Sequence, residues 1–88
     1  MPILGEQREV VLLSKKDCHL CEAVEKELRH RLGATVKLTV VDIDDDPKLR
    51  DKYWVTIPVV RLGGKDVFDA RMMDTRGSWR GKLATILI

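Results

Sequence analysis

The first half of the sequence contains two short apolar segments separated by a long helical pattern. The run Val10–Leu13 is β-branched at its start and predicts a strand over Arg8–Leu13 that is buried on both faces. Alternating apolar and polar residues predict another strand over Thr35–Ile43. Between them, apolar residues at every fourth position predict a helix over Cys18–Leu32, and these are Leu20, Val24, Leu28 and Leu32. A strand, a helix and a strand in succession imply a right-handed crossover that makes the two strands parallel.

Capping and turn signals organise the next part of the sequence. Asp46 before Pro47 is a favourable helix start, so a short helix is predicted over Pro47–Tyr53. The pair Gly63-Gly64 predicts a tight hairpin between strands at Pro58–Leu62 and Lys65–Ala70.

The last part of the sequence predicts one more helix. Ser78 can cap it, and its apolar face holds Trp79, Leu83, Ile86 and Leu87, whereas Arg71–Gly77 is the least regular stretch. The predicted order is β-α-β-α-β-β-α, which describes an α/β fold with a mixed four-stranded sheet and helices on both faces. We expect residues 1–88 to form a single domain.

The composition excludes several classes of protein. Hydrophobic residues make up 44% and charged residues 34% of the chain, which predicts a folded protein that is neither disordered nor membrane-embedded. The 16 basic and 14 acidic residues give a net charge of +2, so no dense phosphate-binding surface and no nucleic-acid partner are expected. No apolar run approaches about 18 residues, and the amino terminus lacks the layout of a secretory signal. We therefore expect a cytoplasmic protein that does not bind membranes.

The cysteines form a single C-x-x-C pair, Cys18 and Cys21, at the predicted strand-to-helix junction. Residues three apart lie on one helix face, so the two sulfurs can bond without large backbone movement. Unpaired N–H groups at a helix start favour a thiolate and lower the pKa of Cys18 below the usual value of about 8.5. We predict a thiol–disulfide oxidoreductase with Cys18 as nucleophile and Cys21 as resolving thiol.

Other interpretations of this region are weighed against the redox pair. A zinc site would need roughly four ligands, and His19 and His30 do not complete an ordinary spacing, so no metal is predicted. The alternative without chemistry is that Cys18 and Cys21 are two inert thiols. His19 either tunes the thiolate or is a solvated bystander. Trp54 is interpreted as a core aromatic residue rather than a substrate platform.

Three motifs over residues 8–70 occur together in a known family. They are Ser14-Lys15-x-x-Cys18-x-x-Cys21, Val41-Asp42-Ile43-Asp44 leading into Asp46-Pro47, and Thr56-Ile57-Pro58 followed by Val59-Val60 and Gly63-Gly64. The chain thereby resembles the glutaredoxin-like branch of the thioredoxin-fold superfamily. The resemblance implies a thioredoxin-like fold in which Pro58 is a cis-proline facing the cysteine pair. It also implies that Ile57 offers backbone groups to the thiol substrate.

The same resemblance implies partners. Lys15 would help to hold a glutathione carboxylate, with glutathione as a co-substrate and no bound cofactor. The family's Gly-Gly-x-Asp element falls near Phe68–Arg71, where the glycines are absent. Substrates would be a disulfide-containing protein or a glutathione adduct, with a thioredoxin-type reductase as a possible electron donor, and the protein is expected to be a monomer. Two alternatives stay open, namely a non-catalytic adaptor that holds a partner at Ile57 and Pro58, and iron–sulfur cluster delivery through the first cysteine.

Overall fold

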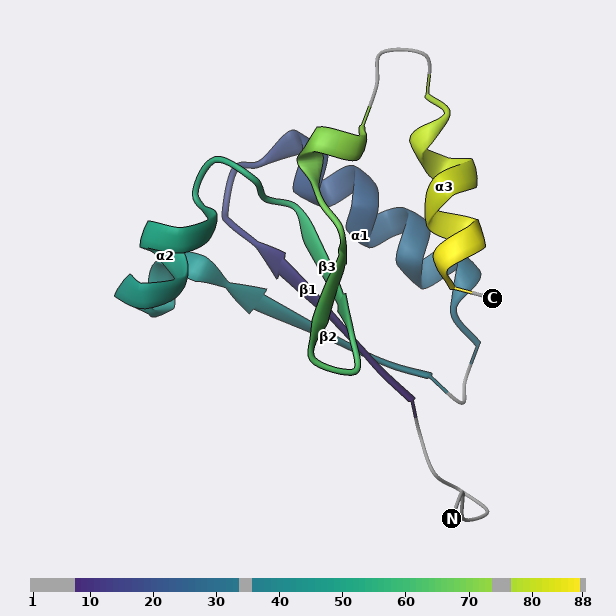
Figure 1. The fold of residues 1–88 in the computed structure, drawn as a ribbon, viewed down its shortest axis with the longest axis horizontal. Coiled ribbons are helices and arrows are strands. Elements are labelled where there is room, and N and C mark those ends of the chain that lie inside the picture. Colours follow the sequence, from purple (N-terminus) through teal and green to yellow (C-terminus); the bar gives the residue numbers. More distant parts are fainter. Residues whose placement is uncertain (1–7, 34–35, 74–76, 88) are drawn as a thin grey trace.

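Four strands form one mixed sheet in the computed structural model, which describes residues 8–33, 36–73 and 77–87 (Figure 1). The spatial order is β2-β1-β3-β4. β1 pairs in parallel with β2, whereas β3 is antiparallel to both β1 and β4. This arrangement confirms the predicted crossover and the mixed sheet. The strands are β1 (Arg8–Ser14), β2 (Val36–Asp42), β3 (Val59–Leu62) and β4 (Lys65–Phe68).

Three α-helices cover the sheet, with α1 and α3 on one face and α2 on the other (Figure 1). The strands and α-helices follow the predicted order β-α-β-α-β-β-α, which is that of a thioredoxin-like α/β fold. Two short 3-10 helices were not predicted. The helices are α1 (His19–Arg31), α2 (Pro47–Tyr53), α3 (Trp79–Ile86), η1 (Ile43–Asp45) and η2 (Ala70–Met72).

Each face of the sheet has its own apolar core. Successive side chains of a strand point to opposite faces, so Leu12 packs beneath α1 and α3 while Leu13 packs beneath α2. The predicted burial of this strand on both faces is therefore confirmed. The larger core contains Val10, Leu12, Val24, Leu28, Val60, Phe68, Trp79 and Leu83, and the smaller contains Leu13, Ile43, Tyr53 and Val59.

One position of the predicted apolar stripe, Leu20, is exposed. Leu20 is 50% exposed, whereas Cys21, Val24 and Leu28 are fully buried. A spacing of four residues drifts by about 40° per step around a helix with 3.6 residues per turn. The inward position in the first turn therefore belongs to Cys21, and Leu20 faces outward.

Several strand ends differ from the prediction by one or two residues. β4 ends at Phe68 and not at Ala70, because the Asp69 carboxylate accepts a hydrogen bond from the Arg71 N–H (2.8 Å) and starts η2. β3 begins one residue after Pro58. β2 ends at Asp42, and Ile43 starts η1. The predicted start of β2 at Thr35 lies outside the described residues.

The local signals of α2 and the hairpin are confirmed. α2 has the predicted bounds, and the Asp46 Oδ1 atom accepts a hydrogen bond from the Lys48 N–H at 2.9 Å. Gly63 and Gly64 have φ angles of +58° and +80°, the left-handed conformation that a two-residue hairpin turn requires. Within the described residues, none of the helices has the length and apolar character needed to cross a membrane.

Candidate active site

The two cysteines lie at the start of α1 and are bonded to each other. Cys18 is the N-cap residue, and its Sγ atom accepts a hydrogen bond from the Cys21 N–H at 3.2 Å. The Sγ atoms of Cys18 and Cys21 form a disulfide, with Cα atoms 5.2 Å apart. Cys18 is half-buried while Cys21 is fully buried. The outer sulfur is thus the one that an approaching molecule can reach.

A tight turn after β1 places Cys18 at the cap. Asp17 has a φ angle of +59°, in the left-handed region that aspartate tolerates better than most residues. This residue redirects the chain from the strand into α1. Lys15 in this connection and His19 in the first turn of α1 are both exposed. Their suggested roles in substrate binding and thiolate tuning remain predictions.

The Ile57–Pro58 peptide bond is cis, as the family resemblance implied. The register pairs Leu13 with Val59, the first residue of β3, so Pro58 lies at the end of the sheet where β1 ends. The Pro58 side chain is fully buried and Ile57 is half-buried. The fold therefore brings the cis-proline and the cysteine pair to the same end of the sheet.

The backbone of Ile57 is only partly free. Its N–H donates to the Tyr53 carbonyl at 3.1 Å, which closes the turn after α2. Among the described residues, no hydrogen bond reaches the Ile57 carbonyl oxygen. The prediction that Ile57 offers backbone groups to a substrate is thereby narrowed to this oxygen.

Trp54 is 65% exposed, so its interpretation as a core aromatic residue is wrong. Neighbouring residues on a helix point in different directions, and at the end of α2 the inward direction is taken by Tyr53, which is 4% exposed. Val55 follows with 62% exposure. The adjacency of two aromatic residues at a predicted helix end was the available signal that one of them faces outward.

The comparisons with known proteins identify the family of this chain. A family model described as "Glutaredoxin-like domain (DUF836)" matches residues 9–86. The chain belongs to this glutaredoxin-like family. No curated protein matches this glutaredoxin-like sequence.

Solved structures support the fold of this glutaredoxin-like domain. The X-ray structure of structural-genomics target protein XcR50 from X. campestris is similar at 32% identity and a TM-score of 0.62, covering 86% of this chain and 96% of that chain. A thioredoxin from Trypanosoma brucei brucei has 24% identity and a TM-score of 0.53, over 93% of this chain and 76% of that one. A designed protein has 20% identity and a TM-score of 0.54, over 94% and 78% of the respective chains. At these identities the last two show the thioredoxin-like fold alone.

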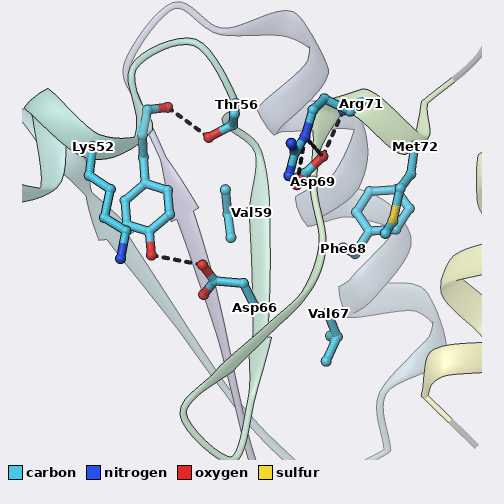
Figure 2. A pocket seen from close by; sticks show the side chains of 10 residues that line it. Lys52, Thr56, Val59, Asp66, Val67, Phe68, Asp69, Arg71 and Met72 are labelled. Atoms are coloured by element: carbon cyan, nitrogen blue, oxygen red, sulfur yellow. Dashed lines mark hydrogen bonds and ion pairs between the residues drawn. The ribbon is translucent and has the colours of Figure 1, made fainter.

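A cavity of about 320 Å³ lies beside the segment that leads into the cis-proline of this glutaredoxin-like domain (Figure 2). Thr56 and Val59 line one side of it, whereas β4 and η2 supply the other side. The residues around it are Lys52, Tyr53, Thr56, Val59, Asp66, Val67, Phe68, Asp69, Arg71 and Met72. Within residues 8–33, 36–73 and 77–87, no group of three or more His, Cys, Asp or Glu side chains is arranged to hold a metal ion.

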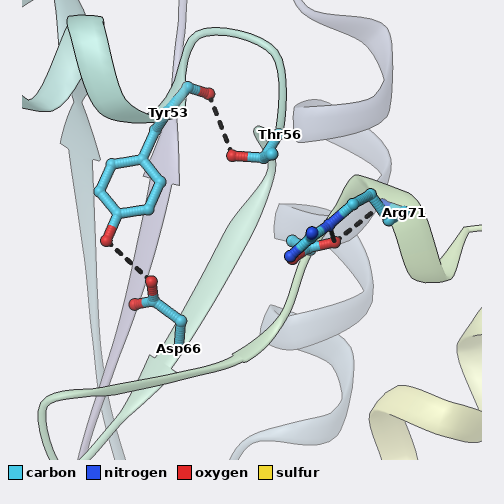
Figure 3. A network of polar contacts seen from close by, with 5 residues as sticks. Tyr53, Thr56, Asp66 and Arg71 are labelled. Atoms are coloured by element: carbon cyan, nitrogen blue, oxygen red, sulfur yellow. Dashed lines mark hydrogen bonds and ion pairs between the residues drawn. The ribbon is translucent and has the colours of Figure 1, made fainter.

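Tyr53 at one end of this cavity belongs to a polar network with Asp66 and Arg61, and Figure 3 shows its hydrogen bond to Asp66. The Tyr53 hydroxyl donates to Asp66 at 2.7 Å, and the Arg61 guanidinium donates to Asp66 at 2.7 Å and to the Tyr53 oxygen at 2.6 Å. Burial raises the pKa of Asp66, but the hydrogen bonds from Tyr53 and Arg61 outweigh it and leave the pKa below its ordinary value. The network ties the end of α2 to the β3–β4 hairpin.

Asp69 and Arg71 form a second polar cluster, at the other end of the cavity (Figure 2). The guanidinium of Arg71 donates to Asp69 Oδ2 at 2.6 Å. Hydrogen bonds from the Arg71 side chain hold the pKa of the Asp69 carboxyl below its ordinary value, against the opposing effect of burial. The Ala70 N–H, between the two residues, donates to the Thr56 carbonyl at 3.0 Å.

Proposed function

We propose that this glutaredoxin-like protein is a thiol–disulfide oxidoreductase in which Cys18 is the nucleophile and Cys21 is the resolving thiol. The observation that carries the proposal is the pairing of a half-buried and a fully buried sulfur, bonded to each other, at the N-terminus of α1. An outer sulfur suits attack on a substrate, and an inner sulfur suits the second step.

In the reaction, the Cys18 thiolate attacks one sulfur of a substrate disulfide. A bond forms between that sulfur and Cys18, and the other substrate sulfur leaves as a thiolate that takes up a proton. Cys21 then loses its proton and attacks the Cys18 sulfur, which releases the second substrate thiolate and forms the Cys18–Cys21 disulfide. Two electrons pass from the cysteine pair to the substrate, and an external thiol donor returns them.

The start of α1 favours the reactive form of Cys18. Its sulfur accepts the Cys21 N–H in the disulfide form, and in the reduced form the same donor would face a thiolate. The positive end of the α1 dipole acts in the same direction. The proposal therefore needs no charged side chain in contact with the sulfur, although the neighbouring Lys15 and His19 would add positive charge when protonated.

The surroundings favour a protein disulfide as substrate. Leu20 within the cysteine motif is exposed, and so are Trp54 and Val55 ahead of the cis-proline, which gives this end of the molecule apolar side chains for a polypeptide to cover. The free carbonyl of Ile57 can accept a hydrogen bond from a substrate backbone N–H. A glutathione adduct bound through Lys15 is the smaller substrate of the same chemistry. Glutathione or a thioredoxin-type reductase would return the electrons in a reducing compartment such as the cytoplasm.

The test is a disulfide-reduction assay driven by dithiothreitol on a protein disulfide substrate. We expect turnover by the wild type and no turnover above background by Cys18→Ser. Reduced Cys21→Ser, freed of dithiothreitol before the substrate is added, should accumulate mixed disulfides. Equal rates for the wild type and Cys18→Ser would remove Cys18 as the nucleophile. The rate of Cys18 alkylation against pH should show a midpoint below about 8.5 if the helix start favours the thiolate.

A further inference from the structure

We propose that Asp69 is a positioning residue for the cis-proline segment, acting through η2 on the Thr56 carbonyl and thereby on the substrate contact at Ile57. This inference rests on the proposed oxidoreductase function. It assigns a role to an acidic side chain that contacts neither cysteine in the reaction described above.

The Asp69 carboxylate is held by hydrogen bonds from Arg71. Its Oδ1 atom accepts the Arg71 N–H at 2.8 Å, and the Arg71 guanidinium donates three further hydrogen bonds of 2.6 to 3.2 Å to the same carboxylate. Asp69 is 9% exposed, whereas the Arg71 side chain is 78% exposed. Asp69 and Arg71 flank Ala70 and are hydrogen-bonded to each other. The backbone is therefore held on both sides of Ala70, and this fixes the direction of the Ala70 N–H.

Ala70 makes the contact with the cis-proline segment. Its N–H donates to the Thr56 carbonyl at 3.0 Å, two residues before Pro58 in the sequence. The Thr56 hydroxyl in turn donates to the Tyr53 carbonyl at 3.4 Å (Figure 3). Because Thr56 is bonded directly to Ile57, the position of its carbonyl determines where the Ile57 backbone lies.

Packing and other hydrogen bonds also act on residues 53–57. A cavity of about 320 Å³ lies between Thr56 and part of β4, so side-chain packing is incomplete there (Figure 2). Within the described residues, two direct hydrogen bonds join residues 53–57 to β4 and η2, namely Tyr53 to Asp66 and Ala70 to Thr56. The second lies next to Ile57, so Asp69 governs the position of the substrate contact more directly than Asp66 does.

A matched pair of variants separates positioning from stability. Asp46 also accepts the N–H two residues ahead, at 2.9 Å, so Asp46→Ala removes a comparable cap whose hydrogen bonds stay within η1 and α2 and do not reach Thr56. We expect Asp69→Ala to raise KM for a protein disulfide by about three- to tenfold, in the range that a lost cap represents. kcat should stay within about twofold, since Cys18 and Cys21 are untouched. Asp69→Asn keeps an oxygen for the Arg71 N–H and should restore KM to within about twofold of the wild type.

Hydrogen exchange provides a readout that does not depend on turnover. Asp69→Ala should speed exchange of the Ala70 amide more than Asp46→Ala does, measured where both variants are folded. The inference is overturned if Asp69→Ala leaves KM and Ala70 exchange no different from Asp46→Ala, or if Asp69→Asn is as impaired as Asp69→Ala. Absence of turnover in the wild type, with normal Ala70 exchange effects, would instead reject the oxidoreductase function.

Discussion

Two N-cap residues of this molecule, Cys18 and Asp69, are held in different ways. At the start of α1, the Cys18 sulfur accepts one hydrogen bond, from the Cys21 N–H at 3.2 Å, and the residue is half-buried. At the start of η2, the Asp69 carboxylate accepts four hydrogen bonds of 2.6 to 3.2 Å from Arg71. The cysteine cap thus has one hydrogen bond besides its disulfide, whereas the aspartate cap has four hydrogen bonds.

The helix whose cap accepts fewer hydrogen bonds is the one that is anchored in the core. α1 is anchored by buried residues, including Cys21, Val24 and Leu28, whereas none of the three residues of η2 is buried. A helix held by its core face does not need a strong cap, so its cap position is available for chemistry. η2 depends on its cap, so Asp69 is not replaceable by a reactive group without loss of order.

The largest expected effect is on turnover. Cys18→Ser and Cys18→Ala should both lower disulfide reduction by at least about a thousandfold, because each removes the proposed nucleophile. Serine is a preferred N-cap and alanine is not, so under reducing conditions the alanine variant should be less stable than the serine variant by about 1 kcal/mol. Steady-state assays and urea unfolding measure the two effects. Equal stability of the two variants would show that the cap at α1 contributes nothing.

Next in size is the anchoring of α1 by its core. Leu28→Ala should lower the free energy of unfolding by about 2 to 5 kcal/mol, because Leu28 is fully buried in the larger core. Met72→Ala in η2 is the matched change, and at 40% exposure it should cost less than about 1 kcal/mol. Urea unfolding of both variants checks this. Similar costs would break the distinction between a core-anchored and a cap-anchored helix.

A smaller effect is expected at acid pH. The pKa values of Asp66 and Asp69 are lowered in the folded state, so their contribution to stability is present above the unfolded value of about 3.9 and is lost as the pH falls through the lower folded values. The stability contributed by these carboxylates should therefore be constant from pH 7 to about 5 and decline below about 4. Unfolding of Asp69→Asn should depend less steeply on pH in that window, as monitored by circular dichroism. A variant with the wild-type slope would contradict the assigned pairing.

The smallest effect is expected at the exposed partner of the aspartate cap. Arg71→Gln removes the guanidinium but keeps the backbone N–H that Asp69 caps. Because this side chain is 78% exposed, its ion pair is screened by solvent and the melting temperature should change little. KM should change by less than about twofold. A change as large as that of Asp69→Ala would assign the ordering of η2 to the ion pair and not to the cap.

Local patterns were enough to predict most of the fold and the cysteine pair. The Asp46-Pro47 signal gave the bounds of α2, and Gly63-Gly64 gave the hairpin. The position of Cys18 at the helix start followed from the apolar strand before it and the helical period after it. These features depend on residues close together in the sequence, where propensity and periodicity act directly.

What the sequence could not predict is which of several local arrangements the folded structure selects. The end of β4 at Phe68 reflects a cap by Asp69 that competes with continued strand pairing, and either outcome fits the local pattern. The hydrogen bond from the Ile57 N–H to the Tyr53 carbonyl depends on how the turn after α2 closes. The exposure of Trp54 depends on which neighbour reaches the sheet. Each is decided by tertiary packing, which a single sequence does not display.

The location of both sulfurs within one turn of α1 has a consequence for electron flow. Since Val24 and Leu28 lock the rest of that helix into the core, we expect making or breaking the bond to leave the shape of the molecule nearly unchanged. In the proposed redox cycle, no conformational change would then favour oxidation of the cysteine pair over its reduction. The relative abundance of oxidised and reduced partners around the protein would set its direction by mass action.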